Sequence, residues 1–233
     1  VTLDRTKVKL INNGTINLSG ANSTAIYGKF AEITNAVTGT INVGSGSAAL
    51  YGLNSSKLEN NGTINLGTGS VGIFSKGDTA AGYTVGANTY KGSVVNSGTI
   101  TSTGKVTVNG IALSDADGSV GLASIDGANI TQTNSDTNII VDGSASIGAY
   151  ADGGTGSIAS TKLTVNGGTI TAKGGAFNIY AGNKATVTLN GANLNTEQKS
   201  LAFYTTNNGK VDFGTGSTKT IATIKGGTDS NSR

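Results

Sequence analysis

The chain contains no cysteine, histidine, proline, methionine or tryptophan. Without cysteine it forms no disulfide, and without cysteine and histidine it lacks the Ser-His-Asp and Cys-His systems of nucleophilic catalysis. The same absence argues against a zinc site, because cysteine and histidine are the main zinc ligands. We therefore expect no cofactor and no bound metal.

Charge is scarce as well, since Asp, Glu, Lys and Arg make up 12% of the residues and the net charge is +3. The basic residues are spread along the chain, so a nucleic-acid partner, which needs a basic cluster, is not expected. No apolar run approaches the roughly 18 residues of a membrane span, so we expect no membrane insertion by this segment. The first residues do not resemble a signal peptide, which makes an internal piece of a longer precursor the expectation for an exported chain.

Short phrases recur through the sequence instead. The first resembles Asn-Gly-Thr-Ile-Asn-Leu and occurs at 13–18, 38–43, 61–66, 97–101, 167–171 and 190–195. A second ends in an aromatic residue, as in Ala25–Tyr27, and a third is a short alternating segment, as in Glu32–Thr34. In the fourth unit we assign Gly110–Ala112 to the second phrase and Ser124–Ile125 to the third. In the fifth unit the first phrase, taken from Asp126 to Thr131, leads with either Ile130 or Ile140.

Each phrase alternates apolar and polar residues, which indicates a strand with one buried face. Units this small cannot bury a core alone, so they must stack. The sequence therefore predicts an all-β, right-handed parallel β-helix of about seven triangular coils of roughly 23 residues, with residues 1–233 as a single segment. We expect Ile16, Ile41 and Ile64 to stack inward, and a ladder of side-chain amides at one corner. That ladder is assigned to Asn13, Asn61, Asn166 and Asn190.

The repeat is interrupted after the second phrase in three successive units. The largest insertion is a loop at 77–93, and shorter ones lie around 115–118 and 152–160. Repeat proteins often carry insertions on a single binding face, although a tolerated surface loop is the simpler explanation.

Outward aromatic residues form a second candidate feature, with Ala112 as an interruption. They are Tyr27, Tyr51, Phe74, Tyr150, Tyr180 and Tyr204. Such rings bind sugars or proteins, or simply stack on one another to stabilise the rod, and the second role is favoured. The candidate ligand-binding residues, drawn from this column and the insertions, are Tyr51, Phe74, Tyr83, Tyr90, Lys91, Asp115, Asp117, Tyr150 and Asp152.

Acidic residues supply an alternative function. Asp78, Asp115, Asp117 and Asp152 follow the second phrase, and clustered carboxylates are what a polysaccharide-degrading β-helix enzyme requires. Aspartate in a turn is the commoner explanation, also for the calcium-loop-like Asp115–Gly118, so we expect no enzyme. Ice binding is a third class, but Thr-Ile-Thr occurs only at 99–101 and 169–171, which is too irregular.

The phrase Asn12–Leu18 followed by Ala25–Gly28 resembles the passenger regions of Gram-negative type V autotransporters, particularly the large adhesins. The resemblance covers almost the whole chain but concerns repeat style rather than a site. It implies a location on the extracellular side of the outer membrane. It also implies an adhesive or stalk role toward a protein or glycan on host cells or other bacteria. We expect a monomeric rod.

Overall fold

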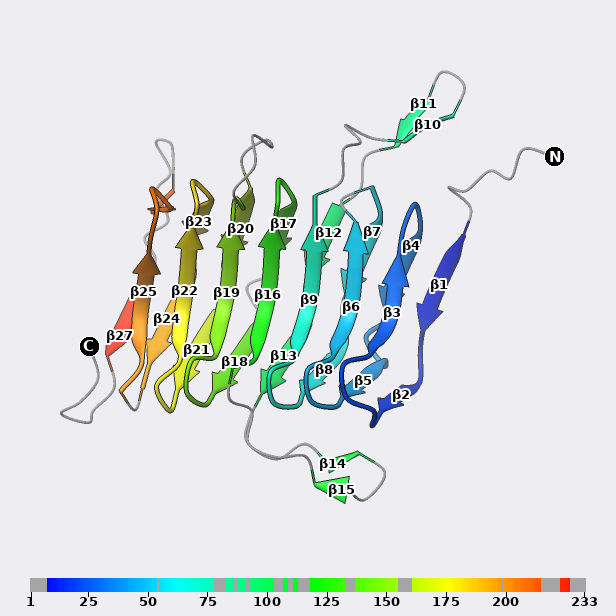
Figure 1. Cartoon of the computed structure of the whole chain (residues 1–233), viewed down its shortest axis with the longest axis horizontal. Coiled ribbons are helices and arrows are strands. Elements are labelled where there is room, and N and C mark those ends of the chain that lie inside the picture. Colours follow the sequence, from blue (N-terminus) through cyan, green and yellow to red (C-terminus); the bar gives the residue numbers. More distant parts are fainter. Residues whose placement is uncertain are drawn as a thin grey trace.

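The computed structural model describes residues 8–53, 55–77, 83–85, 88–90, 93–102, 107–108, 111–112, 118–132, 137–154, 161–197, 199–214 and 223–226. The described residues form strands and turns, and no helix occurs among them. Most strands belong to three parallel sheets whose order follows the chain from one end of the molecule to the other (Figure 1). The fold is therefore all-β, as predicted.

We name the three sheets A, B and C. Sheet A comprises β1 (Lys9–Asn12), β4 (Glu32–Asn35), β7 (Lys57–Asn60), β12 (Ser93–Asn96), β17 (Asn129–Gln132), β20 (Lys162–Asn166), β23 (Thr186–Asn190) and β26 (Lys210–Asp212). Sheet B comprises β2 (Thr15–Leu18), β5 (Thr40–Val43), β8 (Thr63–Leu66), β13 (Thr99–Ser102), β18 (Asn138–Asp142), β21 (Thr169–Lys173), β24 (Asn193–Thr196) and β27 (Thr223–Gly226). Sheet C comprises β3 (Thr24–Gly28), β6 (Ala48–Leu53), β9 (Val71–Lys76), β16 (Val120–Ile125), β19 (Ile147–Asp152), β22 (Phe177–Gly182) and β25 (Leu201–Thr205).

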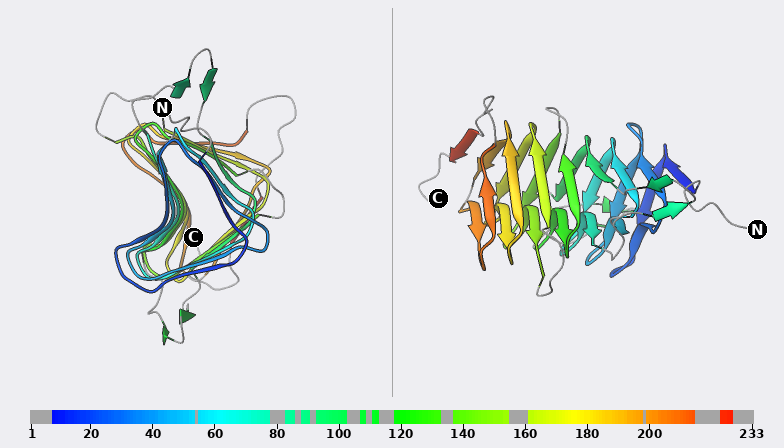
Figure 2. Two further views of the ribbon diagram at one scale, coloured as in Figure 1. Left: turned by 90° about the vertical axis from the view of Figure 1, so that its right-hand side faces the viewer. Right: turned by 90° about the horizontal axis from the view of Figure 1, so that it is seen from above.

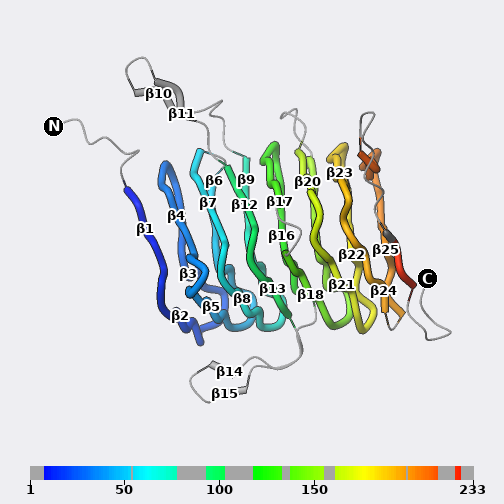
Figure 3. The backbone as a smooth tube through the Cα atoms, turned by 180° about the vertical axis from the view of Figure 1, so that it is seen from behind, coloured from blue at the N-terminus to red at the C-terminus, as the bar shows by residue number. Residues whose placement is uncertain are grey.

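The chain visits the sheets in the order B, C, A and then begins the next coil. This gives a right-handed parallel β-helix of about seven coils, with β1 before the first and β27 after the last. Seen along the rod, the coils superpose on one bent outline, and sheet C occupies the side that curves inward (Figure 2). Sheet A covers the opposite side, as the view from behind shows (Figure 3).

The core is a set of aliphatic columns, one residue per coil. Ile41 pairs with Ile64, Ile64 pairs with Ile100, and all three are fully buried. Sheet A supplies a parallel column through Ile33 and Leu58. Because strand side chains alternate between faces, a single register fixes every inward residue at once.

An asparagine ladder runs through the corner between sheets A and B in the first coils. The amides of Asn12, Asn35, Asn60 and Asn96 bond in series, each nitrogen donating to the next oxygen at 2.8, 2.8 and 2.7 Å. The prediction that Asn13 and Asn61 form this ladder is wrong by one residue, because the position before the turn points inward. The predicted bond between Asn190 and Asn166 is present, at 2.8 Å.

Further along the rod, other residues replace the asparagines of the ladder. Its position is taken by Gln132, whose amide nitrogen donates to the Gly167 carbonyl, and then by the buried Val165 and Leu189. Serines form a similar series at the corner between sheets B and C, where the Ser47 amide donates to Ser70 Oγ at 3.2 Å. The asparagine and serine rungs thus satisfy buried polar groups through the next rung, as buried groups require, whereas Gln132 Oε1 is buried without a hydrogen-bond partner.

The fourth and fifth coils differ from the prediction. Sheet C is occupied there by β16, in which Leu122 pairs with Ile73, so Gly110–Ala112 is not the second strand. Ser124 and Ile125 end β16, and the third strand is β17, which contains Ile130. The fifth coil starts with Ile139, stacked between Ile100 and Ile170, so neither Ile130 nor Ile140 leads it.

Two insertions leave the rod at opposite corners. Between β9 and β12 the chain carries β10 (Tyr83–Val85) and β11 (Asn88–Tyr90), an antiparallel pair beyond the ends of the sheet C strands (Figure 1). Between β13 and β16 it carries β14 (Thr107–Val108) and β15 (Ile111–Ala112), beyond the beginnings of those strands. The fourth-coil insertion therefore lies at the corner between B and C, not at the predicted corner between C and A.

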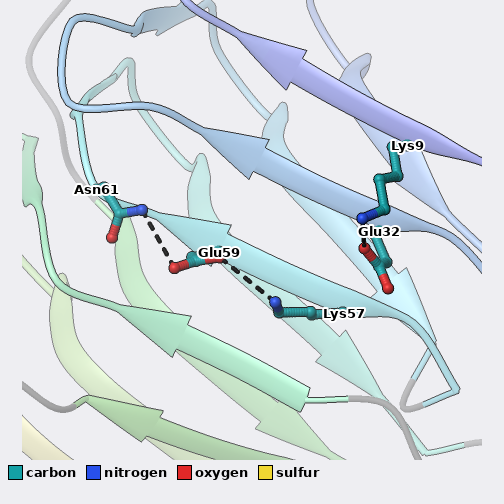
Figure 4. A network of polar contacts seen from close by, with 5 residues as sticks. All are labelled: Lys9, Glu32, Lys57, Glu59 and Asn61. Atoms are coloured by element: carbon teal, nitrogen blue, oxygen red, sulfur yellow. Dashed lines mark hydrogen bonds and ion pairs between the residues drawn. The ribbon is translucent and has the colours of Figure 1, made fainter. Parts of the chain in front are cut away.

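Charged side chains decorate the outer face of sheet A near its first strands (Figure 4). Lys9 Nζ lies 3.1 Å from Glu32 Oε2, and Lys57 Nζ lies 3.8 Å from Glu59 Oε2. Asn61 donates to Glu59 Oε1 at 3.2 Å. These surface ion pairs each contribute at most about 1 kcal/mol to stability, so their main effect is to make this face of the rod polar.

Candidate functional site

The outer face of sheet C is the most distinctive surface among the described residues. Its shape results from an irregularity in the alternation of inward and outward residues along the strands. In β6, both Ala49 and Leu50 are buried, whereas Ala48, Tyr51 and Leu53 are half-buried. The pairing passes over Ala49, since Ala48 pairs with Val71 and Leu50 with Ile73. Two consecutive inward residues bend the strand, and the same pattern recurs in β9, β16, β19 and β22.

Small residues occupy the first of these two inward positions. A Cβ at Gly72 would meet the Ile100 side chain, and a Cβ at Gly121 would meet the Ile139 side chain. In β22 the position is Asn178, which is fully buried and donates to the Ile170 carbonyl at 2.8 Å and the Asn195 carbonyl at 3.0 Å. The close contact between these first inward residues and sheet B thus holds the bend in each strand. Because of the bend, the residue after the two inward positions points outward.

That following outward residue is aromatic in six of the coils. Tyr27, Tyr51 and Phe74 form one stack, with ring centroids 5.3 and 4.8 Å apart. Tyr150, Tyr180 and Tyr204 form a second stack, with centroids 4.7 and 5.6 Å apart. The ring-on-ring packing favoured from the sequence is therefore present, and it fixes the side chains of the column.

A single alanine separates the two stacks. Ala123 pairs with Phe74 on one side and Tyr150 on the other, and it is only 3% exposed. The residue that interrupts the column is therefore Ala123, and the assignment of this role to Ala112 is wrong. Ala112 instead belongs to the β14–β15 hairpin.

A second apolar column runs beside the rings on the same outer face. From the third coil onward, the residue three positions before the outward column is apolar and half-buried. These residues are Val71, Val120, Ile147, Phe177 and Leu201, of which Val120 precedes Ala123 and the others precede aromatic residues. The column was not predicted from the sequence, and it begins only in the third coil, because Thr24 and Ala48 hold the corresponding positions before Tyr27 and Tyr51. The two columns together make the outer face of sheet C largely apolar.

Polar groups gather where sheet C turns into sheet A. Asp152 accepts hydrogen bonds from Asn183 Nδ2 at 2.9 and 3.0 Å, from the Gly154 amide at 2.7 Å and from the Tyr150 hydroxyl at 3.3 Å. Lys76 Nζ lies 3.8 Å from Asp126 Oδ2 in the neighbouring coil. The Asp152 carboxylate is thus fully engaged in holding a turn and the next coil.

Two tyrosines of the second stack are perturbed by this corner. Burial raises the pKa of the Tyr150 hydroxyl, and the charge of Asp152 raises it further. Burial also raises the pKa of Tyr180, with Asp152 as the next cause. A neutral hydroxyl is favoured in both, because ionisation would place a second negative charge beside the carboxylate.

The structure brings together only part of the candidate set. Tyr51, Phe74, Tyr150 and Asp152 lie on one face, and Tyr83 pairs with Tyr90 across β10 and β11, although their side chains lie outside the described residues. Lys91, Asp115 and Asp117 lie outside them too, as does Asp78. Asn183 was not foreseen, because its contact with Asp152 depends on the register between coils.

The described residues include no group of three or more Asp or Glu side chains able to hold a metal ion. A helix long and apolar enough to cross a membrane is absent from the same residues. No protein-family model, curated protein or solved structure matches the chain.

Proposed function

We propose that this chain is an adhesin or stalk segment on the bacterial cell surface, part of the passenger of a Gram-negative autotransporter. It attaches to a protein or glycan on host cells or other bacteria. The observation that carries the proposal is the apolar outer face of sheet C, with its two aromatic stacks and a second apolar column. Tyr27 and Tyr204 are exposed and the other four rings are half-buried, so part of each ring remains open to a partner. Apolar surface gathered on one face marks interaction sites.

The chemistry of this face suits an anchor for a partner. Aromatic side chains combine a large apolar area with few rotatable bonds, so little entropy is lost when a partner covers them. Stacking reduces that loss further, because each ring already holds its neighbour. The insertion between β9 and β12 leaves the rod at the edge of this face where the sheet C strands end. The insertion between β13 and β16 leaves it at the edge where those strands begin (Figure 1).

The repeat architecture supports the stalk part of the proposal. Coils that satisfy their neighbours' buried polar groups form an extended scaffold whose length grows with each repeat. In that role the segment holds a binding region of the precursor away from the membrane and itself binds nothing.

Binding of the fluorescently labelled chain to epithelial cells and to Gram-negative bacteria, measured by flow cytometry, separates the two roles. We expect binding by the intact chain and loss of most of it when residues 78–92 are replaced by a Gly-Ser turn. Replacing residues 103–114 in the same way, which leaves the candidate residues Asp115 and Asp117 in place, is the matched control for removal of an insertion. Binding that survives the 78–92 replacement refutes contact of the partner with the insertion between β9 and β12. Absence of binding by the intact chain leaves only the stalk role.

A point variant tests the face directly. Tyr51→Ser removes the middle ring of the first stack, whereas Ile140→Ser removes a half-buried apolar side chain from the outer face of sheet B. We expect reduced binding for the first variant and unchanged binding for the second. Equal losses contradict a role for sheet C.

We further propose that the chain is not an enzyme, because the one described candidate carboxylate, Asp152, is engaged in a turn. Incubation with pectin, glucans and host glycans should give no turnover. Turnover that Asp152→Asn abolishes would establish the alternative function, polysaccharide degradation.

A further inference from the structure

The junction between the third coil (β8, β9 and β12) and the fourth coil (β13, β16 and β17) has shorter backbone pairing than the junctions beside it. β12 pairs with β17 over two residues, whereas it pairs with β7 of the second coil over four. β13 pairs with β8 over three residues, whereas it pairs with β18 of the fifth coil over four. In sheet C the pairing of β9 with β16 keeps five residues. Two of the three sheets are therefore held less fully at this level of the rod.

The buried asparagine ladder stops at the same junction. Each amide nitrogen of the ladder donates to the side-chain oxygen of the next coil, and the residue that pairs with Asn96 in the next coil is Gln132. Glutamine is one methylene longer than asparagine, and Gln132 Oε1 is buried without a hydrogen-bond partner. Asn96 Nδ2 donates instead to the Gly98 carbonyl, at 3.4 Å. The amide bond that would tie the fourth coil to the third is therefore not made.

A second buried oxygen without a partner lies on the other side of this junction. In the described part of the chain, Ser75 Oγ in β9 is the one buried side-chain atom besides Gln132 Oε1 that makes no hydrogen bond. Ser75 pairs with Ser124 of β16, but Ser124 Oγ donates to the carbonyl groups of Ala128 and Lys162, at 2.9 and 3.1 Å. Unsatisfied buried groups cost free energy, and both of these lie on strands that flank the same junction.

The aromatic column is interrupted at the fourth coil as well. Phe74 is the last ring of the first stack, and Ala123 takes the next position, so no ring of this column joins the third coil to the fourth. Side-chain contacts that do cross the junction include Ser119 Oγ with the Gly67 carbonyl at 2.8 Å, Thr137 Oγ1 with the Asn96 carbonyl at 3.4 Å, and Lys76 Nζ with Asp126 Oδ2 at 3.8 Å. The last of these is a surface ion pair, which contributes little to stability.

The coils on either side of this junction are tied to their other neighbours more fully. Asn35 Nδ2 of the second coil donates to Asn60 Oδ1 of the third at 2.8 Å, and aromatic rings stack across the same junction. The Gly127 amide of the fourth coil donates to Thr161 Oγ1 of the fifth at 2.7 Å. The third and fourth coils are thus joined less strongly to each other than to the coils beyond them.

We propose that the rod consists of two cooperative units, residues 9–96 and residues 99–212, which separate at this junction before either unit opens internally. The stability of stacked repeats is approximately a sum of repeat terms and nearest-neighbour interface terms, so cooperativity breaks at the weakest interface. The first unit has fewer coils and therefore fewer internal interfaces, so it unfolds first. The rod then yields at one defined level while the strands of the second unit stay paired. This inference is independent of the adhesive role.

Amide hydrogen exchange of the whole chain, followed by mass spectrometry of its peptides in rising urea below the unfolding transition, tests the division. We expect peptides from residues 32–66 to share one free energy of opening, and peptides from residues 138–190 to share a second, higher one. A single free energy common to both sets of peptides overturns the proposal. A boundary between the two sets at any other coil junction overturns it too.

Gln132→Asn tests why the junction is weak. The shorter side chain places an amide in line with Asn96, so the ladder continues into the fourth coil. We expect exchange of the first set of peptides to become about tenfold slower, because one buried hydrogen bond is gained at the interface through which the unit opens. Gln198→Asn makes the same chemical change at the other glutamine of the chain, between β24 and β25, and should leave that exchange unchanged.

Circular dichroism of both variants confirms that the strands are retained. Slower exchange in Gln132→Asn alone supports the broken ladder as a cause of the division. Unchanged or faster exchange in Gln132→Asn, or equal slowing in Gln198→Asn, overturns the assignment of the weak point to this gap in the ladder.

Discussion

Asp152 shows how one side chain joins local turn chemistry to the stacking of coils. Its carboxylate accepts from the Gly154 amide within its own turn and from Asn183 in the next coil. The Tyr150 hydroxyl donates to the same group. A single aspartate thus fixes a turn, a neighbouring coil and one ring of the aromatic column, which explains why a turn aspartate here is not free for chemistry.

The raised pKa of Tyr150 and Tyr180 predicts a loss of stability in alkali. The unfolded chain ionises each hydroxyl near the ordinary value of 10.0, whereas the folded chain holds the proton more tightly. Both states are protonated below that pH, so the contribution is fully present there. Above it the unfolded state loses protons first, and the free energy of unfolding falls as pH rises.

Thermal unfolding followed between pH 8 and pH 11 measures this effect. We expect Tyr150→Phe to lose less melting temperature over that range than the unmodified chain. Tyr27→Phe, at the exposed end of the other stack, is the control for removing one hydroxyl. An identical alkaline loss in the unmodified chain and in Tyr150→Phe would argue against the effect.

The elements are short, mostly four to six residues in the three sheets, and none is stable without its neighbours. Their stability comes from columns that cross from coil to coil. The asparagine ladder is the clearest example, because each amide donates to the next and accepts from the previous one. Removing one member therefore leaves two others with a missing partner.

We predict that Asn60→Ala costs about 2–4 kcal/mol of unfolding free energy, since the buried Asn96 amide oxygen loses its donor and the Asn35 amide nitrogen loses its shortest hydrogen bond. Asn42→Ala interrupts a second ladder, between Asn17 and Asn65, that lies on the outer face. Because water replaces those hydrogen bonds, Asn42→Ala should cost less than about 1 kcal/mol of unfolding free energy. Urea unfolding of both variants gives the comparison, and similar costs would show that burial of the ladder contributes nothing.

Most strands could be predicted because their signal is local. Ile41 and Ile64 lie in nearly identical phrases, and alternation alone turns them inward. The fourth coil failed for a reason that alternation cannot detect. Ile111 has the local pattern of a sheet C strand, but it pairs antiparallel within a hairpin, whereas the pattern around Leu122 lacks the aromatic residue that marks the other coils.

The candidate site was predictable from the sequence where it depends on alternation within one strand, and not where it depends on the pairing of coils. Tyr51 and Phe74 follow from the alternation of their strands. The contact of Asp152 with Asn183, residues separated by a full coil, follows only from the register. The position of Ala123 between the two stacks depends on which segment fills the fourth coil, so the correct gap in the column could not be found before the strands were paired.

At the scale of the whole molecule, the rod has three unlike faces. Sheet A carries the ion pairs near its first strands, the outer face of sheet B carries the exposed asparagine ladder, and sheet C carries the apolar and aromatic columns. The bend in each sheet C strand makes that face curve inward (Figure 2). A partner that binds one face therefore meets the same residue types in successive coils.

This account rests on the stacking register through the irregular middle of the rod, where β18 follows β13 in sheet B and Ala123 comes between Phe74 and Tyr150. The chain has no cysteine, so two introduced cysteines have only each other as disulfide partners. Strands in one sheet lie about 4.8 Å apart, a spacing compatible with a disulfide between paired residues.

Oxidative crosslinking of Thr99→Cys combined with Asn138→Cys, followed by electrophoresis, is the most direct measurement. The account predicts a rapid intramolecular disulfide in this variant, because Thr99 pairs with Asn138. It predicts none for Thr99→Cys combined with Asn129→Cys, because Asn129 belongs to sheet A and pairs with Lys162. A disulfide in the second variant and not in the first would contradict the register, and with it the arrangement of the aromatic face.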